Sequence, residues 1–238
     1  MDCIKTQGFR QGIYEVSSTQ KEALGALRIT EDGRKYRYCK ASAVAIIPAV
    51  SLQPAVQTAN HINRSAAATV VGSMQVTFTV GATAVTADQY KDGYLSVNAG
   101  TAGTIGNQYR IKSHTEVAAA GGSITVQLAD PLAVALVATT DKLSLTPNPY
   151  CGCSIGDAAK GSCGITVVAV PASNYFWSQT GGVGCAWVVN ATAEGSCLIP
   201  AASGLLKLWV VDYLQPQVGY ALAAGVTSNA KPVYLSID

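Results

Sequence analysis

Short runs in which apolar and polar residues alternate recur along the chain, and they restrict the possible folds more than any other feature. Residues 74–80 alternate Met, Val, Phe and Val with Gln and Thr. The same two-residue period occurs at residues 108–112, 124–128, 143–145 and 233–237. Successive side chains of a β-strand point to opposite faces, so each run predicts a half-buried strand. Gly, Asn and Asp bound these runs, which is typical of a sandwich or barrel.

One hairpin and few helices are predicted. Asp32-Gly33 separates two strand-like runs within residues 27–38, and Asp-Gly favours positive φ at both central turn positions. Asp130-Pro131 has a capping residue followed by proline, which predicts a short helical turn through about Leu136. We therefore expect an all-β protein with two β-barrel or β-sandwich-like units, an extended N-terminal arm with a hairpin, and few short helices.

Loop signals divide the sequence into three sections. Residues 1–60 are predicted to form an arm plus the hairpin, residues 61–147 a first β domain, and residues 148–238 a second β domain with all three Trp. The second boundary follows from Pro147-Asn148-Pro149, because each proline favours extended geometry before it. The sequence leaves open whether residues 1–60 pack with the second β domain and make it discontinuous. Residues 1–13 are expected to order only against a neighbour.

The protein has few charges for a soluble polypeptide. Charged residues are 13%, against about 25% in ordinary soluble domains. Mean hydropathy is only +0.25, and no run approaches the 18 or so apolar residues of a membrane helix. Such a protein must bury much of its uncharged surface, and burial between subunits is the simplest place. Met1 to Lys5 lack an apolar signal region, so we expect no secretory signal and synthesis in the cytoplasm with reduced thiols.

Positive charge is concentrated near the N-terminus. Residues 1–40 contain eight Lys or Arg and five Asp or Glu, a net charge of +3, and the remaining residues have a net charge of −1. This surplus is too sparse for the dense basic patch of a nucleic-acid-binding protein. It suits either a solvated hairpin or a contact with an acidic protein surface.

The residues that usually carry chemistry are scarce, so we predict a protein that is not an enzyme, with no catalytic, cofactor or metal residues. His61 and His114 are expected to be surface or loop residues. Cys151-Gly152-Cys153 and Cys163 match the paired cysteines of a zinc site poorly. The favoured interpretation is that they pack as small apolar side chains, and a metal site and a disulfide are the alternatives.

An aromatic group in the last section has two interpretations. Tyr175-Phe176-Trp177, Trp187 and Trp209 suit a core or a subunit interface, and alternatively a platform that stacks on sugars.

Several stretches together resemble those of a known family. They run from Leu24-Gly25-Ala26-Leu27 to the ending Pro232–Asp238 and comprise residues 24–27, 32–41, 109–114, 130–132, 146–150, 170–172, 175–179, 218–222 and 232–238. In this order they resemble virion structural proteins of tailed bacteriophages, most closely the head decoration (cement) proteins that bind the outside of the capsid. The likeness spans nearly the whole sequence and rests on scattered turn and strand residues.

The resemblance implies a homotrimer that sits on the outer capsid surface of the virion and clamps neighbouring major capsid subunits. It implies no direct contact with nucleic acid or membrane and no catalytic residues. Under this hypothesis the candidate contact residues are aromatic and basic side chains of the arm, the hairpin and the last section: Phe9, Arg10, Tyr14, Arg34, Arg37 and Trp187. The alternatives are another phage structural component (neck, head fibre or tail) and a carbohydrate-binding adhesin module.

Overall fold

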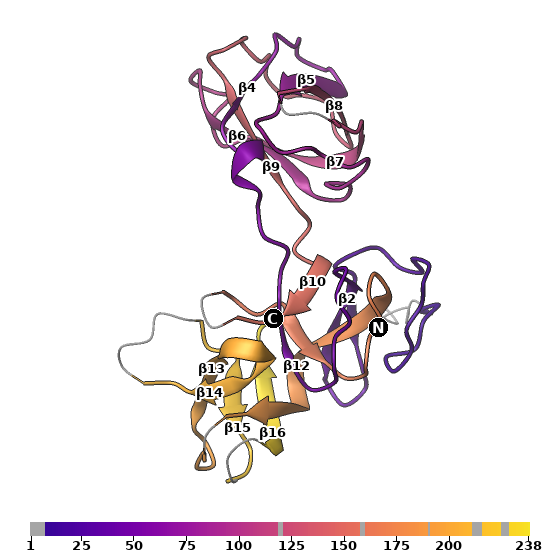
Figure 1. The fold of residues 1–238 in the computed structure, drawn as a ribbon, viewed down its shortest axis with the longest axis vertical. Helices are drawn as coiled ribbons and strands as arrows, with labels where there is room; N and C mark the ends of the chain where they lie inside the picture. The colour runs from indigo at the N-terminus through magenta and orange to yellow at the C-terminus, as the bar shows by residue number, and fades with distance from the viewer. Residues whose placement is uncertain (1–7, 119–120, 158–159, 190, 211–215, 225–228) are drawn as a thin grey trace, which may run out of the picture. The chain divides into compact units, whose positions relative to one another are not determined.

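The computed structural model describes residues 8–118, 121–157, 160–189, 191–210, 216–224 and 229–238, and the protein divides into two units. Residues 1–55 and 149–238 form the split unit, and residues 56–148 form the inserted unit between its two parts (Figure 1). The described residues contain strands and only two three-residue 3-10 helices, η1 (Ala59–His61) and η2 (Ala202–Gly204). This confirms the predicted all-β class with two β units.

The split unit consists of two closed five-stranded barrels that share one strand. The first barrel runs in the order β2 (Lys35–Ala41), β10 (Cys151–Ile155), β3 (Ser51–Gln53), β11 (Gly164–Thr166) and β12 (Tyr175–Val188), and β12 returns to β2. The second runs β12, β14 (Leu206–Leu208), β13 (Cys197–Pro200), β15 (Gly219–Ala221) and β16 (Asn229–Ser236), and β16 returns to β12. Closure leaves β1 (Leu27–Ile29), which pairs with β2, as the edge strand.

Pairing along β12 explains why residues 1–55 belong to the same unit as residues 149–238, the arrangement that the sequence leaves open. Its first half pairs with β2 from Tyr175 to Gly181, and its second half pairs with β16 from Gly181 to Val188 (Figure 1). Residues 35–41 are thereby built into the same sheet as residues 149–238. Gly182 lies where the partner changes, with φ of +80°, and an added Cβ there would meet the Arg34 Cα at 3.0 Å. Glycine is therefore required at this bend.

Alternation along the strands gives each barrel its own core. Phe176 packs inside the first barrel with residues such as Leu52 and Val170. The second barrel is filled by apolar side chains from all five of its strands, among them Val188, Leu206 and Val233. Trp177 points the other way from Phe176, and together with Tyr36 and Tyr38 it forms a separate cluster on the outer face of β2 and β12.

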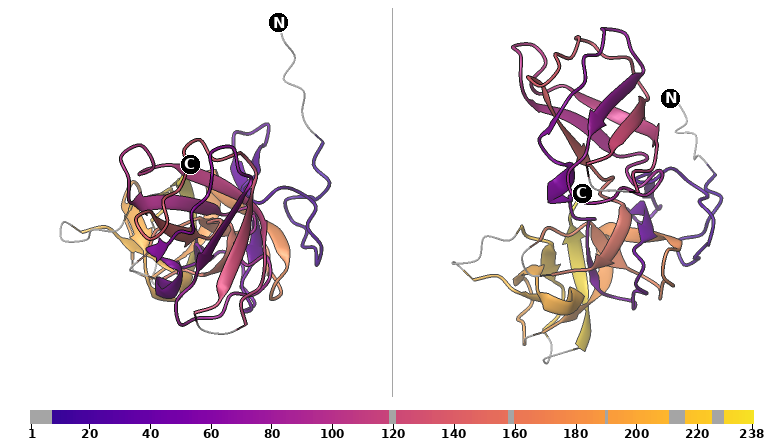
Figure 2. Two further views of the ribbon diagram at one scale, coloured as in Figure 1. Left: turned by 90° about the horizontal axis from the view of Figure 1, so that it is seen from above. Right: turned by 45° about the horizontal axis from the view of Figure 1, so that its top comes forward.

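The inserted unit is a third barrel. Its sheet runs in the order β4 (Arg64–Ser65), β9 (Lys142–Thr146), β6 (Tyr94–Ala99), β7 (Gln108–His114), β8 (Ser123–Leu128) and β5 (Gln75–Thr79). A bridge between Ala66 and Phe78 connects the residue after β4 to β5 and closes the ring. The ribbon of this unit can be followed in Figure 2. Its buried apolar side chains form a single core. Val76, Phe78 and Val80 are buried, as the alternation predicts, whereas Met74 is exposed.

Two local predictions are wrong. At the hairpin only Gly33 has positive φ, because the loop is longer than two residues: Thr30 N–H bonds the Arg34 carbonyl, and Gly33 N–H bonds the Thr30 carbonyl. No helical turn follows Asp130-Pro131. Leu132 and Leu136 are buried there, and their N–H groups bond the Ser73 and Thr69 carbonyls, so tertiary pairing replaces the helix.

Candidate protein-binding surfaces

The described part of the N-terminal arm is folded onto the aromatic cluster of the split unit. The Phe9 and Trp177 rings meet edge to face at 5.1 Å, and Tyr38 meets Trp177 at the same distance. The Arg28 guanidinium lies over the Phe9 and Trp177 rings, 5.1 and 5.7 Å from their centroids. These are cation–π geometries, which stabilise the arm on the barrel.

Gln11 fastens the arm through buried hydrogen bonds. Its Nε2 donates to the Tyr175 and Glu15 carbonyls, and Tyr38 O–H donates to its Oε1 at 2.6 Å. Its backbone carbonyl accepts from Trp177 Nε1 at 3.0 Å. The expectation that residues 1–13 order only against a neighbour is therefore wrong for residues 8–13, because their own barrel supplies the surface. Residues 1–7 lie outside the described residues.

The split unit also has a cavity of about 320 Å³, the Tyr14 pocket, which is lined in part by the arm. Two of the predicted contact residues, Tyr14 and Arg34, meet there. The remaining lining comes from the 48–49 turn, from β11 and the residue after it, and from β12: Pro48, Ala49, Thr166, Val167, Gln179, Val183, Gly184 and Cys185. A pocket of this size suits a small ligand or one or two residues of a peptide.

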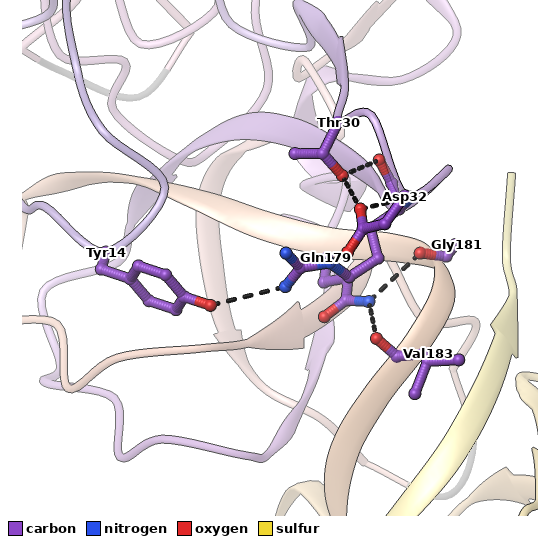
Figure 3. A network of polar contacts seen from close by, with 7 residues as sticks. Tyr14, Thr30, Asp32, Gln179, Gly181 and Val183 are labelled. Atoms are coloured by element: carbon purple, nitrogen blue, oxygen red, sulfur yellow. Dashed lines mark hydrogen bonds and ion pairs between the residues drawn. The ribbon is translucent and has the colours of Figure 1, made fainter.

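Arg34 supplies the positive charge of the Tyr14 pocket. Its Nη1 donates to the Tyr14 hydroxyl at 3.4 Å, and its Nε pairs with Asp32 Oδ2 at 2.7 Å (Figure 3). The hydrogen bond with Tyr14 raises the pKa of the Arg34 guanidinium against the opposing effect of burial, and Asp32 raises it further. Hydrogen bonds from Thr30 and Arg34 lower the pKa of Asp32, so the pair stays ionised.

Gln179 supplies a buried amide whose orientation is fixed. Its Nε2 donates to the Gly181 and Val183 carbonyls at 3.2 and 2.8 Å (Figure 3). Carbonyl oxygens only accept hydrogen bonds, so the side of the amide that faces them must be the NH₂ group, and Oε1 lies on the opposite side. Oε1 accepts no hydrogen bond from the described residues. It is an acceptor without a donor in the wall of a pocket.

The other predicted contact residues lie apart from the pocket. Arg10 is exposed on the arm, and its backbone N–H bonds Glu22. Arg37 is engaged within the unit: its Nε pairs with Asp238 at 2.5 Å, its Nη1 donates to the Gly25 carbonyl, and its guanidinium lies over the Tyr150 ring. Trp187 is half-buried against the core of the first barrel. The structure thus brings together only Tyr14 and Arg34 in the pocket.

The inserted unit has an exposed apolar surface that was not predicted from the sequence. Residues 69–74 lie beside residues 128–137: Thr69 and Leu136 exchange backbone hydrogen bonds, and Gly72 N–H bonds the Leu132 carbonyl. The side chains that point outward define the valine patch: Val70, Val71, Met74, Val134 and Val137, exposed by 73, 61, 42, 37 and 47%. The only charged residue in these two segments is Asp130. Val70 and Val71 could have indicated this surface from the sequence. Neighbouring residues of a strand point to opposite faces, so at least one of two consecutive valines must be exposed when only one face is buried.

The histidines are buried, contrary to the prediction. His61 is completely buried, and its two ring nitrogens contact the Tyr90 hydroxyl at 2.6 Å and the Thr83 carbonyl at 3.0 Å. His114 Nε2 accepts from the Tyr90 N–H at 2.8 Å. Both rings are held by partners inside the inserted barrel, where they support its loops.

Three cysteines of the first barrel lie together without a disulfide. Cys39, Cys153 and Cys163 are buried there as thiols, with 3.6 Å between the Cys153 and Cys163 sulfurs, and burial raises the pKa of Cys39. Within the described residues no group of three His, Cys, Asp or Glu is placed to hold a metal ion. No helix in the described ranges is long and apolar enough to cross a membrane.

Comparisons with known proteins found no relative. No protein-family model, no curated protein and no solved structure matches the sequence.

Proposed function

We propose that this is a structural protein that associates with copies of itself and binds another protein surface. The valine patch is the observation that carries this proposal. Large apolar side chains exposed together in a protein with few charges are typical of a protein–protein interface. Burial of these side chains in an interface would be favourable by roughly 25 cal/mol for each Å² of apolar surface removed from water.

Within this class, the role that we propose is that of a decoration protein on the head of a tailed bacteriophage. The resemblance in turn and strand residues supports this choice. A homotrimer would cover the valine patches of its subunits and place several binding surfaces on one particle. Because the surfaces bind together, avidity exceeds that of one contact by about 10²–10⁴. The trimer would thereby hold neighbouring capsid subunits against separation.

Binding to undecorated phage heads tests this role. Purified protein mixed with such heads is expected to co-sediment with them saturably and to raise the temperature at which they release DNA. Absence of saturable binding, or binding at a single vertex in electron micrographs, would contradict a cement role. The second result would favour a neck, head-fibre or tail component instead.

Variants of the valine patch test the surface itself. Val71→Glu is expected to weaken self-association at least about tenfold, because a charge would be buried without a partner. Ala84→Glu is the matched control, since Ala84 is exposed in the same unit next to Val85, whose backbone pairs with Val117 and not with the patch segments. Equal association of both variants and the unchanged protein would show that the patch is not an interface.

A carbohydrate-binding module is the second candidate, and one observation favours it. Tyr220 and Tyr234 stack at 5.2 Å on the outer face of β15 and β16, where they are exposed by 37 and 39%. Trp187, which is half-buried, suits a platform less well. Glycan-array binding that is lost in Tyr234→Ala, with association unchanged, would support this candidate.

A further inference from the structure

Three polar groups of the Tyr14 pocket are free to bind a ligand. Arg34 uses Nε for Asp32 and Nη1 for Tyr14, and its Nη2 has no acceptor among the described residues. The Tyr14 hydroxyl accepts from Arg34, which leaves its own hydrogen free to donate. Gln179 Oε1 is free to accept, since its amide nitrogen is committed to two carbonyls (Figure 3). The pocket therefore offers two donors, one of them charged, and one acceptor.

These groups select for a particular ligand chemistry. A guanidinium and a phenol hydroxyl are suited to a carboxylate, because charge-assisted hydrogen bonds are the stronger kind. An amide oxygen requires an N–H donor, and Pro48, Val167 and Val183 add an apolar wall. An acidic residue of a polypeptide combines a carboxylate, an amide N–H and aliphatic carbons within one or two residues.

Neighbouring charge argues against a more highly charged ligand. Asp32, whose side chain is 56% exposed, sits on Arg34 and offsets much of its charge. A phosphate dianion would be bound by Arg34 alone and repelled by the Asp32 carboxylate. A carboxylate ligand has a single negative charge, for which the free Nη2 of Arg34 is sufficient.

We propose that the Tyr14 pocket binds a carboxylate-bearing residue of a partner polypeptide, with the carboxylate on Arg34 and Tyr14 and an amide N–H on Gln179. The carboxylate comes from an Asp or Glu side group or from the C-terminus of the partner polypeptide. This inference rests on the proposed function only in naming a protein as the partner. The chemistry of the pocket is measured without that partner.

Cys185 provides a reporter, because it is exposed and lines the pocket. Alkylation by iodoacetamide is followed by peptide mass spectrometry in the full-length protein, with Cys197, exposed on β13 and outside the pocket lining, as the internal control. The probes are N-acetyl-aspartate methylamide for a side group and N-acetyl-glycyl-valine for a terminus. Their neutral carboxamide analogues and inorganic phosphate are the comparison. The acids are expected to slow alkylation of Cys185 saturably and to leave Cys197 unchanged, with the neutral analogues at least about tenfold weaker.

Variants connect the protection to the pocket. Arg34→Gln is expected to abolish it and Tyr14→Phe to weaken it, and Lys21→Gln, which removes an exposed positive charge of the arm, is expected to leave it unchanged. Tyr14→Phe removes a single oxygen from an exposed ring, so the result stands even if Arg34→Gln unfolds.

The inference is overturned by equal protection from acids and neutral analogues, by protection that survives in Arg34→Gln, by stronger protection from phosphate, or by no protection at all. Because these measurements use no phage heads, their failure leaves the head-binding test intact. Failure of head binding with Cys185 still protected overturns the proposed function alone.

Discussion

Asp141 shows how one residue can organise two loops. It is completely buried in the inserted unit, and its carboxylate accepts from Thr101 N–H at 2.7 Å, Thr104 O–H at 2.8 Å and Val137 N–H at 2.6 Å. Burial alone would raise the pKa of Asp141, but the hydrogen bonds from Val137, Thr101 and Thr104 outweigh it, and the pKa is lowered. An ionised carboxylate is therefore part of the folded barrel.

Asp141→Asn is expected to destabilise the inserted unit by about 2–4 kcal/mol, because an amide cannot accept on both sides and leaves a donor unpaired. Amide hydrogen exchange in β6 and β9 measures this, with the exposed Asp130→Asn as control. All three Trp lie in the split unit, so fluorescence would not report it. Equal exchange in the two variants would contradict the assignment.

Acid should destabilise the same unit. Since the pKa of Asp141 is lowered on folding, its contribution is complete above its unfolded value of about 3.9 and is lost as pH falls through the folded value. We expect the protection factors of the β9 amides, which are corrected for the intrinsic pH dependence of exchange, to fall over that range, and the fall to be smaller in Asp141→Asn. An acid response identical in both proteins would show that other groups carry it.

At the scale of elements, the backbones of β15 and β16 lie too close together at Gly219 to admit any side chain there. A Cβ added at Gly219 would lie 1.9 Å from the Tyr234 carbonyl oxygen. We expect Gly219→Ala to cost about 2–3 kcal/mol or more, since the backbone must move. Denaturation followed by Trp fluorescence tests this, with Gly8→Ala, which meets no atom within 4 Å, as control. An unchanged midpoint would contradict the close pairing.

The arm is a second element with a measurable role. Phe9→Ala removes the ring that covers Trp177 and is expected to cost about 1–2 kcal/mol. Trp emission should shift to longer wavelength and proteolysis within residues 8–24 should accelerate, whereas Val16→Ala, an exposed change in the same arm, should do neither. If both variants behave alike, the arm is not held by this contact.

Sequence alone predicts the regular elements better than the surfaces. Alternation locates β5, β7, β8, β9 and β16, because their periods follow from local geometry. The segment after Asp130 was mispredicted, because its pairing with residues 69–74 depends on contacts distant in sequence. Tyr14 and Arg34 could be selected from the sequence as candidate contact residues, because one is aromatic and the other is basic. Gln179 could not be selected, since only the fold places it in the pocket wall and commits its amide nitrogen to two carbonyls.

For the whole molecule, the two units are expected to fold separately. The inserted barrel has a closed ring and its own core, and the polypeptide enters and leaves it at residues 55–56 and 148–149. Residues 56–148 expressed alone should show cooperative unfolding by circular dichroism. Residues 1–55 joined to 149–238 by a short Gly-Ser linker should keep buried Trp emission. Failure of both pieces to fold would contradict this division.

We propose that this protein, which has few charged residues, associates with itself through exposed apolar surface. Sedimentation equilibrium of the purified full-length protein measures this association. We expect a particle of three times the monomer mass of 24.5 kDa, which dissociates in Val71→Glu and persists in Ala84→Glu. A stable particle of 24.5 kDa at all concentrations would contradict it.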